Sequence, residues 1–199
     1  MFYKPRHRSI NCLFHAKMSS PFADSKYITT IDNLRDILQK CTLCNKLTLN
    51  GSLIMPCDKL STIKLPNNKQ KKYFLIIHVP SRSESNNFLG HWLGCCINTQ
   101  TKQCLLVDSA NVVPSQTGTM HYISNFCNAN RLTLLNFNLM FQDKSNVLCG
   151  QYQLYICSIF SKRSLRQTLN LKYMLQKYNL KKLAYFIIQQ VERHFHIKF

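Results

Sequence analysis

The order of apolar and polar positions predicts helices and strands in the first half of the chain. Apolar residues at positions 31, 34, 37 and 38 within Thr30–Lys40 share one face of a helix. Residues Tyr73–Val79 form an apolar run of strand length between polar loops, which is typical of a buried strand. The runs His91–Asn98 and Gln103–Asp108 flank the polar connection Thr99–Lys102. That spacing predicts a hairpin, and its pairing would bring His91 and Asp108 toward the same edge.

The second half of the chain is predicted to contain more helix. Residues Met120–Asn130 have helical spacing, and Thr133–Phe141 is apolar enough for a strand. From Cys149 onward the apolar positions again follow a helical period. Two basic segments, Leu165–Tyr178 and Leu180–His194, are predicted to be further helices.

Length and composition predict one folded domain. The chain has 199 residues, of which 45% are hydrophobic, enough for one well-buried core and short for two. Residues 1–26 mix basic, serine and proline residues without a period, so we expect a basic lead-in or tail. Residues 27–199 are then expected to form a single domain.

The charge is strongly biased to one sign. Lysine and arginine number 26 against 8 aspartate and glutamate residues, which gives a net charge of +18. Such a field attracts polyanions, among which nucleic acid is the commonest in cells. We therefore expect the protein to contact DNA. The candidate contact residues lie in the predicted C-terminal helices and are Lys172, Lys177, Lys181 and Lys182. A non-enzymatic, basic nucleic-acid-binding protein is one alternative that these charges leave open.

The ten cysteines are expected to be reduced and mainly core-filling. Their spacing is irregular, and no apolar segment of signal-peptide type follows the basic N-terminus. No apolar run approaches the length of a membrane span, so we expect an intracellular protein that is not secreted and does not contact a membrane. The pair Cys41-x-x-Cys44 could be half of a zinc site, but no second pair stands at ligand spacing. Packing at a helix end is the favoured interpretation, and no metal is predicted.

Four residues can form a thiol-protease site. Cys149 precedes Gly150 at the start of an apolar helical pattern, and a helix N-terminus or a neighbouring imidazolium stabilises a thiolate. His91 would be the base, and Asp108 would orient it. Gln142, seven residues before Cys149, could donate to an oxyanion together with the backbone N–H of Cys149. In the alternative interpretation these side chains only pack.

These residues also resemble a known family. Gly90-His91-Trp92, the acid in Asp108-Ser109, and a glutamine seven residues before Cys149-Gly150 are similar to the motifs of the adenain family, the adenovirus-type maturation cysteine proteases. Residues 56–60 (Pro-Cys-Asp-Lys-Leu) weakly resemble a further viral segment. The resemblance implies an adenain-like α+β fold, with a central mixed β-sheet flanked by helices. It also implies a viral endopeptidase that cleaves capsid or core precursors after small residues, in the virion and the host cell nucleus.

The resemblance leaves some alternatives open. Ubiquitin-like-modifier (SUMO-type) deconjugating proteases share the order of the motifs, but they usually carry an aspartate before the nucleophile and one fewer residue after the glutamine. Here Leu148 precedes Cys149, which favours the viral branch, although Asp108 stands where adenovirus enzymes usually have glutamate. Adenovirus-like members use DNA and a disulfide-linked peptide as activators, which makes Cys127 a weak candidate for that link. A buried thiol is the favoured interpretation of Cys127, and no cofactor is required for the chemistry itself.

Overall fold

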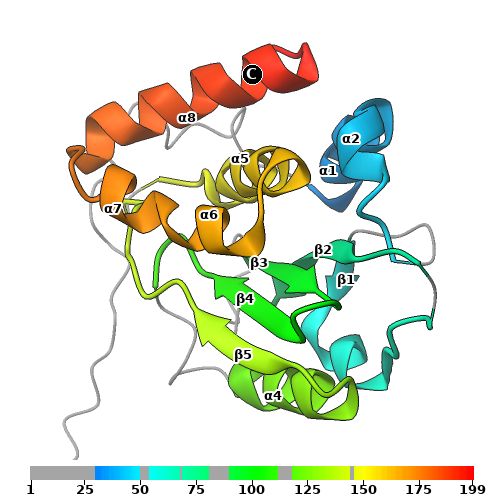
Figure 1. Ribbon diagram of the computed structural model, residues 1–199. Coiled ribbons are helices and arrows are strands. Elements are labelled where there is room, and N and C mark those ends of the chain that lie inside the picture. Colours follow the sequence, from blue (N-terminus) through cyan, green and yellow to red (C-terminus); the bar gives the residue numbers. More distant parts are fainter. Residues whose placement is uncertain (1–29, 50–53, 68, 81–89, 112–117, 144–145) are drawn as a thin grey trace, which may run out of the picture.

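A mixed five-stranded sheet forms the centre of the protein (Figure 1). The structure is a computed structural model that describes residues 30–49, 54–67, 69–80, 90–111, 118–143 and 146–199. The spatial order of the strands is their order in the sequence. Their bounds are β1 Ile54–Pro56, β2 Lys72–Val79, β3 His91–Asn98, β4 Gln103–Val107 and β5 Thr133–Asn136. The two edge pairings, β1 with β2 and β4 with β5, are parallel, and the pairings between β2, β3 and β4 are antiparallel.

Both faces of the sheet are buried. Side chains alternate between the faces along each strand: Phe74 and Ile76 of β2 face one core, while Leu75 and Ile77 face the other. The first core lies between the sheet and helices α1 (Ile31–Lys40), α5 (Cys149–Lys162) and α8 (Leu180–Phe195). The second lies under α4 (Thr119–Ala129) and the 3₁₀ helix η2 (Cys57–Thr62). The expected α+β class, a mixed sheet flanked by helices, is confirmed.

Helix α5 lies between the sheet and α8 (Figure 1). Residues 150–158 and Phe160 are all buried, so the helix is covered on every side. A helix of this kind is a core element rather than a surface one. Cys149, its first residue, is therefore held by a rigid part of the molecule.

Several predicted elements are confirmed. Helix α1 begins after Thr30, whose hydroxyl accepts a hydrogen bond from the Asn33 N–H at 3.2 Å, as an N-cap residue does. Strands β3 and β4 pair across the predicted connection, with Asn98 opposite Gln103. Helices α4, α5 and α8 stand where apolar periodicity predicted them. The lead-in at residues 1–26 lies outside the described residues.

The predicted strand Thr133–Phe141 is wrong beyond Asn136. The Phe137 N–H makes a last bond to the Leu106 carbonyl at 2.9 Å, and Asn138 then adopts a left-handed conformation (φ 48°). Phe137 and Phe141 turn into the first core, where the Phe141 ring lies 5.3 Å from that of Tyr152. Apolar residues that looked like a strand are thus used to pack against α5.

The prediction of one continuous helix over Leu165–Tyr178 is also wrong. Two short helices, α6 (Leu165–Leu169) and α7 (Leu171–Leu175), replace it and meet at Asn170. Leucines of both helices are buried in the first core, so the break lets the chain follow the surface of that core. Within the described ranges, no helix is both long and apolar enough to cross a membrane.

Candidate active site

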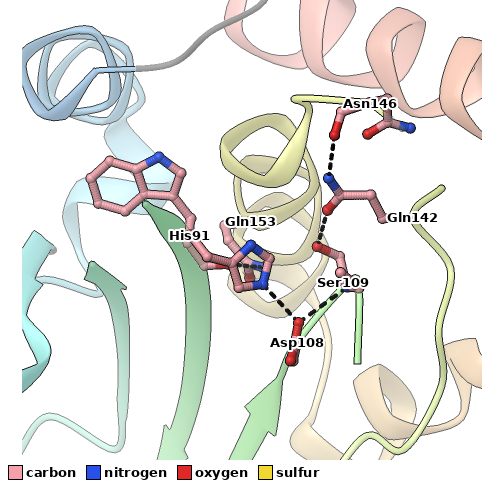
Figure 2. Close-up of polar contacts among 8 residues, drawn as sticks. His91, Asp108, Ser109, Gln142, Asn146 and Gln153 are labelled. Atoms are coloured by element: carbon pink, nitrogen blue, oxygen red, sulfur yellow. Dashed lines mark hydrogen bonds and ion pairs between the residues drawn. The ribbon is translucent and has the colours of Figure 1, made fainter. Parts of the chain in front are cut away.

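The β3–β4 hairpin brings a histidine and a carboxylate together (Figure 2). His91 is the first residue of β3, and Asp108 follows the last residue of β4. The His91 Nε2 donates to Asp108 Oδ1 at 2.8 Å. The Asp108 side chain is 6% exposed and that of His91 is 20% exposed. The same Oδ1 accepts a hydrogen bond from the Ala110 N–H at 3.1 Å, which fixes the carboxylate.

Cys149 lies on the other side of the imidazole, at the start of α5. Its thiol is near enough to His91 to help raise the pKa of the imidazole, and Nδ1 is the ring nitrogen left to face it because Nε2 is bound to Asp108. The thiol is half-buried. The preceding residue, Leu148, makes no side-chain cap to the first turn of α5. Cys149 thus combines a basic neighbour with a helix N-terminus.

The electrostatic setting keeps His91 protonated. Burial alone would lower the pKa of His91. The hydrogen bonds to Asp108 and Cys149, together with the charges of these two groups, outweigh burial and raise the pKa of His91 from 6.5 to about 10. At neutral pH the imidazole is therefore an imidazolium, which is the form that stabilises a thiolate beside it.

Gln142 is held by hydrogen bonds at both ends of its carboxamide (Figure 2). Its Oε1 accepts from the Ser109 hydroxyl at 2.5 Å, and its Nε2 donates to the Asn146 carbonyl at 3.2 Å. Its own backbone N–H donates to the Ser109 carbonyl at 2.9 Å. The side chain is buried, with 4% exposure. A carboxamide has two N–H donors, so one remains for a substrate oxygen after the bond to Asn146.

Three further residues support this site and were not assigned by the sequence. Ser109 and Asn146 fix the orientation of Gln142. Gln153, four residues after Cys149 on α5, is fully buried and donates from Nε2 to the Trp92 carbonyl at 3.1 Å. That bond joins α5 to the strand residue next to His91. The position of Ser109 beside Asp108 was the only sequence signal for any of the three, since Asn146 and Gln153 follow no pattern.

The remaining candidates lie away from these residues. Cys127 of α4 is in the second core, 2% exposed, with its thiol hydrogen-bonded to Cys104. This is the environment that the favoured buried-thiol interpretation predicts, and the activating-peptide link stays a prediction. The four C-terminal lysines are on α7, on α8 and between them; Lys177, Lys181 and Lys182 are exposed and Lys172 is half-buried.

Comparisons with known proteins identify no family. No family model matches the chain, and no curated protein matches it significantly. Among solved structures, the chain is similar to the SUMO protease Ulp1, in a structure whose catalytic cysteine is oxidised to a sulfinic acid. The two share 13% sequence identity with a TM-score of 0.38, over 80% of this chain and 77% of that one.

Proposed function

We propose that this protein is a cysteine endopeptidase with Cys149 as nucleophile, His91 as base, Asp108 as orienting acid and Gln142 as oxyanion donor. One observation carries the proposal. His91 lies between a buried carboxylate at 2.8 Å and the thiol at the N-terminus of α5. Thiol proteases need this arrangement, because the imidazole must hold a proton beside the thiolate and later deliver it to the leaving amine.

The steps follow from the positions of the groups. The Cys149 thiolate attacks the scissile carbonyl, and negative charge develops on its oxygen. The backbone N–H of Cys149 and the second N–H of Gln142 stabilise that charge. His91 gives its Nδ1 proton to the leaving amine, and Asp108 holds the ring in place throughout. His91 then takes a proton from a water molecule, and the oxygen of that water attacks the thioester. The carboxylic acid product leaves, and the Cys149 thiolate is restored.

Thiol reactivity tests this proposal directly. Cys149 and Cys41 are both half-buried, so Cys41 is an internal control of similar access when labelling is done in the presence of a metal chelator. We expect a thiol-directed electrophile to label Cys149 stoichiometrically and faster than Cys41, as mapped by mass spectrometry. His91→Ala should slow labelling at Cys149 alone, and Cys149→Ala should abolish peptide cleavage. Faster labelling elsewhere, with Cys149→Ala still active, would refute the proposal.

For the substrate, we propose viral capsid or core precursors, cleaved after small residues in the virion and the host cell nucleus. This rests on the sequence motifs, with Leu148 before the nucleophile and seven positions from Gln142 to Cys149. A SUMO-type deconjugating protease is the alternative. Peptides with small residues at the scissile bond should be cut, while a folded modifier fusion with the same scissile sequence should not. Efficient release of the folded modifier would favour the alternative.

We further propose that the C-terminal helices bind DNA without sequence preference. Exposed tyrosines accompany the lysines: Tyr173, Tyr178 and Tyr185 are 60%, 41% and 46% exposed. Lysines that contact phosphates and aromatic rings that stack on bases are the usual components of such surfaces. From position 162 to 199 the only acid is Glu192, so little opposes the attraction to a phosphate backbone.

A further inference from the structure

Three metal-binding side chains from opposite ends of the chain meet beside α5. Cys41 precedes the short helix α2 (Thr42–Asn45), Cys44 lies within it, and His194 is in the last turn of α8. The two sulfur atoms and a ring nitrogen of His194 all lie within 4.8 Å of one another. The sequence predicted no metal because no histidine pair stood at ligand spacing. The histidine of the cluster is 153 residues away from Cys41, and only the docking of α8 brings it near.

One distance within the cluster matches a tetrahedral zinc site. Zinc binds sulfur at about 2.3 Å and imidazole nitrogen at about 2.0–2.1 Å. At a tetrahedral angle these bonds separate a sulfur from a nitrogen by about 3.6 Å. The Cys41 Sγ and His194 Nε2 are 3.6 Å apart. The pair therefore needs no rearrangement to share one ion.

A fourth sulfur is within reach. Cys157 lies on α5 and is fully buried, and its thiol is near enough to that of Cys44 to raise the pKa of Cys44. Cys157 is not one of the three side chains whose ligand atoms lie within 4.8 Å of one another, so its side chain would have to turn toward Cys41 and His194. It would then complete a Cys₃His set, one of the ordinary sets of structural zinc sites. This set leaves no open coordination position for water, so such an ion would stabilise the structure rather than catalyse a reaction.

The surroundings of the ligands shift the pKa values of two of them. Burial and the positive charges of Lys162 and His196 lower the pKa of His194. Lys162 Nζ is 3.5 Å from His194 Nδ1. The lysine is exposed, so it can turn away when Nδ1 carries the proton. The contact with Cys157, followed by burial, raises the pKa of Cys44, so binding is expected to release protons from the thiols.

We propose that Cys41, Cys44, Cys157 and His194 bind one zinc ion that fastens α2 to α5 and α8. The ion would join an N-terminal element to the C-terminal helix across the helix that begins at Cys149. It is a structural role, independent of the proposed protease activity.

The experiment uses the full chain with Cys149→Ala, so that the nucleophile cannot contribute a ligand and no activity is needed as readout. Protein purified under reducing conditions is analysed for zinc by mass spectrometry and then titrated with Co²⁺. We expect one zinc per chain and, with cobalt, the visible absorption of a tetrahedral thiolate site. Added zinc should raise the melting temperature, since it binds only the folded chain.

Substitutions then assign the ligands. Cys41→Ser, Cys44→Ser and His194→Gln should each weaken binding by more than about 100-fold, since losing even an outer partner costs about 10–100-fold. Two matched controls should bind like the parent: His196→Asn, an exposed histidine two residues from His194, and Cys104→Ser, a buried thiol in the second core. Circular dichroism must show that each variant is folded, so that lost binding is not caused by misfolding. Cys44→Asp then tests whether a carboxylate ligand restores the binding that Cys44→Ser loses.

The proposal is overturned if no metal binds, or if binding survives Cys41→Ser and His194→Gln. It is also overturned if Cys41 and Cys44 form a disulfide under the same reducing conditions, because a disulfide leaves no thiolate to bind zinc. An unchanged cobalt spectrum in Cys157→Ser would overturn the assignment of the fourth ligand.

Discussion

Gln142 is the residue whose proposed role depends most on its neighbours. Ser109 and Asn146 fix its carboxamide, so its second N–H has a defined direction. Gln142→Ala should lower kcat by about 10²–10³ with little change in KM, because the deleted donor acts mainly in the transition state. Ser109→Ala should lower kcat in the same direction by less, since the amide remains but can rotate. Steady-state kinetics on a peptide substrate measures both.

A control separates this effect from reduced stability. Gln70 also donates from Nε2 to backbone carbonyls, those of Lys46, Thr48 and Lys72. Gln70→Ala should therefore reduce stability without changing kcat. A raised KM with normal kcat in Gln142→Ala would remove this residue from the oxyanion site.

The pKa of His91 links stability to pH. It is raised from 6.5 to about 10 in the folded protein, so the folded state binds the proton more tightly than the unfolded chain does. The resulting stability is fully present below about pH 6.5 and is lost as pH rises through about 10. Asp108→Asn removes one cause of the raised pKa. The difference in unfolding free energy between parent and variant, on the order of 2 kcal/mol at pH 6, should shrink toward pH 10.

Denaturant unfolding at a series of pH values measures that difference. Comparing two curves cancels the titration of lysines, tyrosines and other cysteines, which both proteins share. A difference that stays constant from pH 6 to pH 10 would show that His91 is not the titrating group. Activity should decline over the same alkaline range as the imidazolium is deprotonated.

At the scale of elements, the contact between β3 and α5 decides how the thiol meets the imidazole. Gly94 of β3 faces Gln153 of α5, and a Cβ at Gly94 would lie 2.4 Å from Gln153 Oε1. Gly94→Ala should push this carboxamide away and break its bond to the Trp92 carbonyl, at a cost of about 1–3 kcal/mol. Activity should fall as well, because the displaced helix carries Cys149.

A double-mutant cycle tests whether this contact is the cause. In a Gln153→Ser background the shorter side chain leaves room, so Gly94→Ala should cost much less than in the parent. Thermal or denaturant unfolding of the parent, the two single variants and the double variant gives the coupling free energy between Gly94 and Gln153. Equal costs in both backgrounds would mean that another neighbour, such as Phe74, produces the strain.

Local patterns predicted much of this architecture, and contacts between distant segments account for the rest. The hairpin that pairs His91 with Asp108 could be predicted because it spans only 17 residues. The end of β5 could not be predicted, since the burial of Phe137 and Phe141 depends on α5. The support of Gln142 by Ser109 spans 33 residues. The contact between Cys41 and His194 could not be predicted either, because 153 residues separate them.

The whole molecule carries a net charge of +18, and the lysines of the proposed DNA surface contribute only part of that charge. Changing Lys172, Lys177, Lys181 and Lys182 to glutamate should weaken DNA binding. It should also reduce the slope of log K against log [salt], by about 0.9 for each phosphate that the variant no longer neutralises. Cleavage of a short free peptide should stay near normal, because these lysines lie on other elements than the site.

The control makes the same charge change elsewhere. Lys40, Lys46, Lys59 and Lys102 are exposed on other elements, and their change to glutamate alters the net charge equally. If both quadruple variants bind DNA more weakly to the same extent, only the overall charge matters. If the C-terminal variant binds like the parent, the basic helices serve solubility or a protein partner instead.

The antiparallel centre of the sheet has a consequence for how the protein folds. Strands β2, β3 and β4 follow one another in sequence and pair with their neighbours, so their contacts close short loops and form early. The base and the acid would then meet before α5 docks and delivers the thiol, which leaves folding intermediates without a competent nucleophile. Pulse-labelling hydrogen exchange during refolding should show amides of β3 and β4 protected before those of α5. A chain emerging from the ribosome would thus be spared cleavage by its own unfinished copies.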